Sequence, residues 1–119
     1  MNIQIKRAYE PPEASDGFRI LVDRMWPRGL SKEHLRLDMW LRDIAPSSPL
    51  RKWFGHDPAK WDQFKANYLE ELANNPGSIE LFLQAAKGQA KVTLVYGAKD
   101  PLHNQAVILQ EFLQQHRKP

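Results

Sequence analysis

Two short segments of the sequence carry side chains that could bind an anion and move a proton. Arginine guanidinium groups present forked donors that match a carboxylate or phosphate, and histidine exchanges protons near neutral pH. The first segment contains Asp23, Arg24, Trp26 and Arg28, and the second contains Lys99, Asp100, His103 and Asn104. If the two segments meet in space, they predict a pocket for a small anionic substrate that is phosphate- or nucleotide-like.

Basic and aromatic side chains would bind this substrate. Arg24, Arg28 and Lys99 would hold its anionic group, and the ring of Trp26 would cover it. His56, which follows a Trp-Phe-Gly sequence, is a further candidate for binding. The structural alternative is that Trp26 only closes the end of the core.

Acid–base chemistry would fall to His103, oriented by Asp23 or Asn104. Asp100 and the proline after it predict a helix start that places His103 in the first helical turn, where the helix dipole disfavours the imidazolium. Two structural alternatives remain: Asp23 pairs with a neighbouring arginine, and Asp100 serves only as a helix cap. The reaction class stays open, although hydrolysis and group transfer need the fewest additional groups.

No metal or cofactor is predicted. His56, Asp57 and His103 lack the ligand spacing of a motif such as H-E-x-x-H. The chain has no cysteine, which excludes disulfides, thiol nucleophiles and iron–sulfur clusters. The sequence also has no nucleophile elbow, Walker loop or dinucleotide fingerprint.

Two non-catalytic functions remain open. The segment 19–36 holds five basic and two acidic residues, so its own net charge of +3 equals that of the whole chain. This segment could contact nucleic acid. Arg24, Arg28, Lys32 and Arg36 recur every four residues, but Pro27 and Gly29 prevent one continuous recognition helix, so backbone contacts would be expected. The other alternative is a ligand sensor or partner-binding module without turnover. The sequence leaves the oligomeric state open.

Hydrophobic patterning predicts a small α/β fold in which a mixed, partly parallel sheet is flanked by helices. Residues 2–7 alternate as a half-exposed strand, and residues 92–96 show no polar–apolar alternation, as in a strand buried on both faces. Strands are also predicted at 18–22 and, in preference to a bent helix, at 37–45. Helices are expected at 32–35, at 50–54, from Asp57 to the Asn-Pro-Gly at 75–77, from Ser78 to Gly88, and after Asp100-Pro101.

The composition is that of one globular domain covering residues 1–119, with 42% apolar and 26% charged residues. No apolar stretch is long enough to cross a membrane, and the first seven residues are too polar for a signal peptide. We therefore expect a cytoplasmic protein without membrane contact.

Three blocks of sequence resemble the YeaO-like proteins, small bacterial members of a domain family of unknown function. The blocks are DGFRILVDRMWPRGLSKE at 16–33, WFGHDP at 53–58, and VTLVYGAKD at 92–100 followed by His103-Asn104. The resemblance runs across nearly the whole chain, and only Met25 departs from it, where leucine is expected. It implies a compact α/β fold in a bacterial cytosol, and it implies no reaction.

Overall fold

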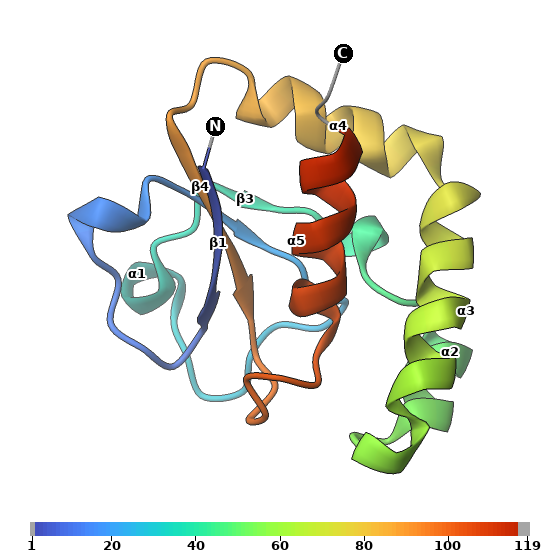
Figure 1. Cartoon of the computed structure of the whole chain (residues 1–119). Coiled ribbons are helices and arrows are strands. Elements are labelled where there is room, and N and C mark those ends of the chain that lie inside the picture. Colours follow the sequence, from blue (N-terminus) through green and yellow to red (C-terminus); the bar gives the residue numbers. More distant parts are fainter. Residues whose placement is uncertain (1, 117–119) are drawn as a thin grey trace.

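The centre of the molecule is a four-stranded sheet in which every strand pairing is parallel (Figure 1). The structure is a computed structural model that describes residues 2–116. Along the sheet, the order is β1 (Asn2–Arg7), β4 (Lys91–Tyr96), β2 (Phe18–Leu21) and β3 (Met39–Trp40). β4 lies inside the sheet with a strand on each side, and its residues 92–96 are buried as predicted because both faces of the sheet are covered. The α/β class is confirmed.

Four helices pack together on one side of the sheet and bury the main core, with α5 directly against β1 and β4. They are α2 (Ser48–Phe54), α3 (Trp61–Ala73), α4 (Pro76–Ala86) and α5 (Gln105–His116). The alternating strand residues Ile3, Ile20 and Leu94 point to this side and share a buried cluster with Phe64 of α3 and Leu109 of α5. No helix within residues 2–116 is long and apolar enough to cross a membrane.

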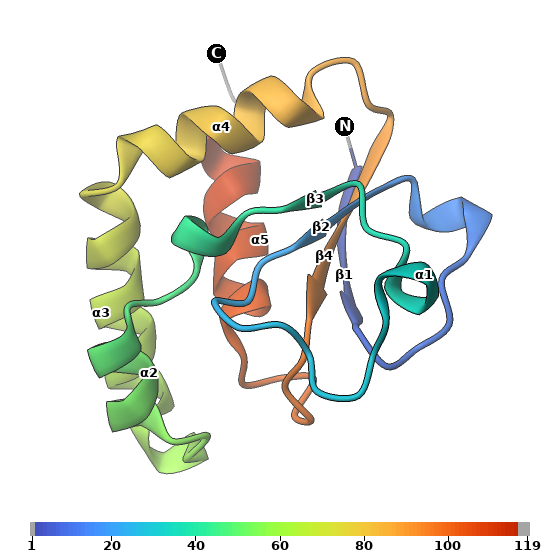
Figure 2. The ribbon, with the colours of Figure 1, turned by 180° about the vertical axis from the view of Figure 1, so that it is seen from behind.

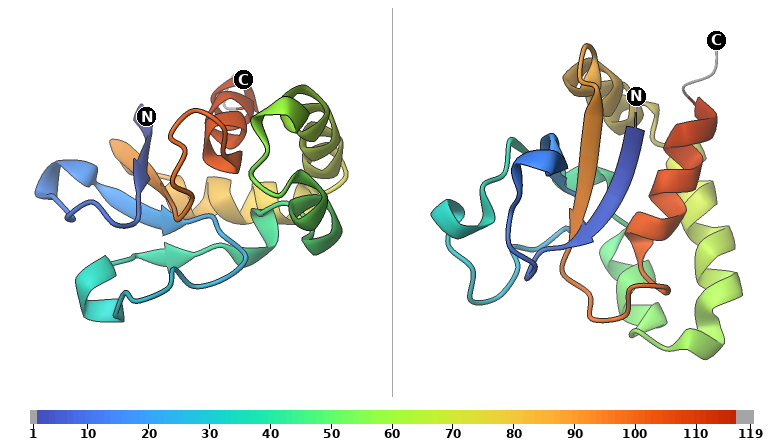
Figure 3. Two further views of the ribbon diagram at one scale, coloured as in Figure 1. Left: turned by 90° about the horizontal axis from the view of Figure 1, so that it is seen from below. Right: turned by 60° about the vertical axis from the view of Figure 1, so that its left-hand side comes forward.

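The opposite face of the sheet is covered by a short helix, α1 (Lys32–Leu35), by the loop that follows β1 and by the segment between β2 and α1 (Figures 2 and 3). Leu35 packs there against Leu21 and Val95. Ser31 caps α1 as predicted, because its hydroxyl accepts a hydrogen bond from the His34 N–H. This second layer brings the β1 loop and the β2 loop to the same end of the sheet.

Several predicted boundaries need correction. The segment 37–45 is only briefly a strand, at β3, and then forms a 3₁₀ turn at Arg42–Ile44. The last helix begins at Gln105, four residues after Pro101, because Asn104 rather than Asp100 caps it. The helix expected from Ser78 begins two residues earlier, at Pro76, which tolerates the first helical position because it needs no N–H partner.

Candidate functional site

A cavity of about 400 Å³ opens at the carboxyl ends of β2 and β4. The two strands are parallel neighbours, so the loops that follow them leave the same edge of the sheet. The cavity brings together every predicted site residue except Lys99, namely Asp23, Arg24, Trp26, Arg28, His56, His103 and Asn104. Lys99 is exposed and does not line it.

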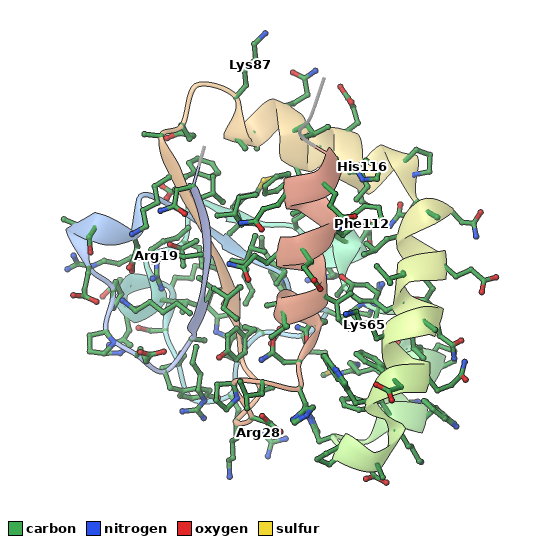
Figure 4. The ribbon with its side chains drawn as sticks, in the orientation of Figure 1. Arg19, Arg28, Lys65, Lys87, Phe112 and His116 are labelled. Atoms are coloured by element: carbon green, nitrogen blue, oxygen red, sulfur yellow. The ribbon has the colours of Figure 1, made fainter. Side chains whose placement is uncertain are left out.

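Three loops at this edge are tied to one another by specific contacts. The Tyr9 hydroxyl, in the β1 loop, donates to the carbonyl of Arg28 at 2.8 Å. Arg7 donates from Nε to the carbonyl of Ala98 at 3.1 Å, and its guanidinium lies over the Tyr9 ring. Arg28 is exposed at the lower end of the molecule, where the strands finish (Figure 4). The rim of the cavity is therefore braced by the β1, β2 and β4 loops together.

Asp23 is partly buried in the cavity wall. Its Oδ2 accepts the Gly97 N–H at 2.9 Å, and its Oδ1 accepts from Nε2 of Gln105. A Cβ on Gly97 would stand 2.8 Å from Asp23 Oδ2, so a larger residue at position 97 would displace the carboxylate. Burial raises the pKa of Asp23 to about 6, although these hydrogen bonds and the nearby charges of Arg51 and His56 act in the opposite direction. The arginine pairing considered for Asp23 is absent among the described residues.

Arg51 of α2 is a cavity residue that the sequence did not single out, as are Tyr9 and Gln105. Its Nε is buried and has no hydrogen-bond partner among the described residues. Its Nη2 lies 3.6 Å from the sulfur of Met25, whose side chain is 62% exposed at the cavity mouth. A buried donor without an acceptor costs free energy, and the side chain that carries this donor lines the cavity.

Arg24 lines the cavity, but most of its donors are already used. Its Nε donates to the carbonyl of Pro46 and its Nη2 to the carbonyl of Ala45, both at 3.1 Å. Its Nη1 lies 3.7 Å from an Asp43 oxygen. Arg24 therefore fastens the β2 loop to the segment before α2, and Arg28 and Arg51 keep more donors for a ligand.

His103 is positioned differently from the prediction. It precedes α5 instead of lying in its first turn, because Asp100 closes a separate turn by accepting the backbone N–H groups of Leu102 and His103. His103 Nδ1 lies 2.8 Å from Asp100 Oδ2, and the Trp61 ring contacts the imidazole edge-on. The N–H of Leu102, followed by the contact with His103, lowers the pKa of Asp100.

The partner of His103 is therefore Asp100, and neither of the two predicted orienting residues contacts the imidazole through a hydrogen bond. Asn104 is occupied as the cap of α5: its Oδ1 accepts the N–H groups of Ala106 and Val107, and its Nδ2 donates to the carbonyl of Asp100. Asn104 thus acts structurally at the cavity wall.

Two other predicted residues show both structural and cavity contacts. Trp26 donates its indole N–H to the carbonyl of Leu30 at 2.6 Å and packs edge-on against Trp40, so it also closes the smaller core. His56 is exposed at the cavity with φ +59°, a left-handed conformation that is uncommon outside glycine. Such backbone strain is frequent where a side chain must be aimed at a site.

Residues 2–116 contain no group of three or more histidine, aspartate or glutamate side chains arranged to hold a metal ion. The basic segment 19–36 does not form one continuous exposed surface, because Arg19 is buried and Arg24 is bound to carbonyl groups. Arg28, Lys32 and Arg36 are its exposed cations.

Comparison with known proteins gives one consistent family. A family model described as "Inactive DUF488-N3 subclade" matches residues 2–118. The uncharacterised protein YeaO of Escherichia coli is 46% identical over 113 residues, which cover 95% of this chain and 97% of the relative. The uncharacterised proteins Mb3100c of Mycobacterium bovis and Rv3073c of Mycobacterium tuberculosis are each 36% identical over 111 residues, covering 93% of this chain and 92% of each relative. No solved structure matches.

Proposed function

This chain belongs to the same family as YeaO and to the inactive DUF488-N3 subclade, and we propose that it is a cytoplasmic protein that binds a small anionic ligand in the cavity between the β2 and β4 loops. The observation that carries the proposal is Arg51, which lines the cavity and whose Nε has no acceptor among the described residues. The volume of about 400 Å³ suits a small metabolite.

The charge of the cavity supports an anion. Three arginines, Arg24, Arg28 and Arg51, line it, against a single lining carboxylate, Asp23. No ion pair within residues 2–116 involves Arg28 or Arg51. Two cations without protein counterions in a partly enclosed cavity attract negative charge more strongly than they would in open solvent.

Binding without turnover fits the family description better than catalysis does, because that description carries the word "inactive". The described cavity lining also holds no serine, threonine or cysteine that could act as a nucleophile. The ligand would then regulate the protein or its partner, as in a sensor.

We expect Arg51→Met to weaken the binding of inorganic phosphate and of nucleoside monophosphates about 10- to 100-fold, because a hydrogen bond to a charged group contributes about 1.5–3 kcal/mol. Thermal-shift screening followed by calorimetry measures the change, since a ligand that binds only the folded state raises its apparent stability.

Lys52→Met is the matched control. It removes the same charge from the next residue of α2, whose side chain is exposed and does not line the cavity. The proposal fails if both variants bind equally well, or if no phosphorylated compound stabilises the wild-type protein.

A catalytic function is the second candidate, and the contact between His103 and Asp100 favours it. A carboxylate 2.8 Å from Nδ1 fixes the ring and leaves Nε2 as the acid or base. For a compound that the protein turns over, His103→Ala should reduce kcat about 100-fold or more while binding is retained. Equal kcat in the two proteins would remove His103 from any mechanism, and binding without turnover in the wild type supports the sensor.

A further inference from the structure

Asp23 introduces an acceptor into a cavity that otherwise favours anions. We infer that the natural ligand carries two groups, an anionic group and a separate hydroxyl or N–H donor, and that Asp23 accepts from this donor while Arg51 and Arg28 hold the anion. Hydroxylated phosphates, such as sugar phosphates and nucleoside 5′-phosphates, have this combination. The inference rests on the proposed function and specifies its ligand class.

The carboxylate of Asp23 has unused capacity for hydrogen bonds. An ionised carboxylate offers about four acceptor positions. The protein fills one on each oxygen, through the Gly97 N–H and the Gln105 amide. These two bonds hold the carboxylate in one orientation at the cavity wall, so further donors must come from water or from a ligand.

The charged groups around Asp23 do not neutralise it by direct contact. Arg51 and His56 act on it electrostatically, yet neither forms an ion pair with it within 4.0 Å. On the core side, the buried hydroxyl of Tyr68 donates to the carbonyl of Ile44 and so is not available to Asp23. A bare anion on Arg51 would therefore be repelled by Asp23, whereas a ligand that also donates to Asp23 would be stabilised by both.

The rest of the cavity wall suits a carbon skeleton between the two polar groups. Phe54 and Phe64 stack with ring centroids 4.1 Å apart, and both line the cavity together with Pro27 and Ala98. Apolar walls with a few fixed polar groups are the usual composition of a small-molecule site. A free inorganic anion would leave this apolar surface uncovered.

The first test compares inorganic phosphate, butyl phosphate and ribose 5-phosphate on the wild-type protein by calorimetry at pH 7.5. We expect ribose 5-phosphate to bind at least tenfold more tightly than butyl phosphate, which has a similar anionic group but no hydroxyl. Equal affinities would overturn the inference and leave the proposed function intact. Failure of all three to bind would overturn both.

The second test uses Asp23→Asn, with Asp62→Asn as the control on an exposed position of α3 away from the cavity. We expect Asp23→Asn to weaken the binding of ribose 5-phosphate at least fivefold. The binding of butyl phosphate should stay the same or become tighter, because the carboxylate no longer repels its anionic group. If the affinities for both ligands change in the same direction and by the same factor, the inference is contradicted. If the variant does not fold, the wild-type series decides alone.

Discussion

Replacing Asp16 by alanine should lower the free energy of unfolding by about 3–5 kcal/mol, the loss expected when a buried ion pair is broken from one side. Asp16 lies on the second face of the sheet and is 1% exposed. Its Oδ2 is 2.6 Å from Arg19 Nη1, and its Oδ1 is 3.1 Å from Lys6 Nζ. Arg19 is only 4% exposed and Lys6 only 9%, so the alanine variant would leave both cations buried without the Asp16 carboxylate.

The measurement is denaturant unfolding at pH 7, with Glu111→Ala as the control. Glu111 also pairs with a lysine, Lys65, at 3.3 Å, but that pair is exposed and its loss should cost less than about 1 kcal/mol. Similar losses in the two variants would show that Lys6 and Arg19 reach water or other acceptors without Asp16.

The same network has a predictable acid dependence. Burial alone would raise the pKa of Asp16, but hydrogen bonds from the Glu13 N–H, Lys6 and Arg19 hold it below the ordinary value of 3.8. A carboxyl whose pKa is lowered by folding stabilises the fold above about pH 4 and loses this contribution as the pH falls through its folded value.

Much of the fold followed from local patterning. The lack of alternation at 92–96 predicted a strand covered on both faces, and the burial of all five residues confirms this. The prediction for 37–45 was wrong over most of its length, because Trp40 donates its indole N–H to the Asp23 carbonyl and Arg42–Ile44 turns towards α2. Such contacts across the fold override local propensity.

The candidate site was predictable where polar residues directly follow strands. Asp23 and His103 could be placed at one edge because parallel neighbouring strands end together. Arg51 could not, because it lies inside a helix and reaches the cavity only through the way α2 packs. Asn104 and Arg24 were predicted as site residues, but their polar groups are mostly occupied by structural contacts. Asn104 caps α5 and Arg24 binds loop carbonyls, and the sequence alone does not show these hydrogen bonds.

Asp23→Asn should stabilise the protein at pH 8 by up to about 3 kcal/mol. Burial raises the pKa of Asp23 from 3.8 to about 6, and keeping the carboxyl ionised above that value costs about 1.4 kcal/mol for each pH unit of the difference. Because folding raises the pKa of this acid, the cost is fully present above about pH 6. It decreases as the pH falls and is absent below about pH 4, where both folded and unfolded states are protonated.

The free energies of unfolding of wild type and Asp23→Asn, measured from pH 8 to pH 4, should therefore converge as the pH falls. The difference in unfolding free energy between wild type and Asp62→Asn should stay constant over the same range. If Asp23→Asn is instead less stable at pH 8, the bonds of the carboxylate to Gly97 and Gln105 outweigh its burial. A stabilised variant that has also lost its preference for ribose 5-phosphate would mean that the chain keeps a destabilising carboxylate for its ligand. Stability given up at one position for binding is the pattern expected of a functional site, and it would place Asp23 there independently of any assay for turnover.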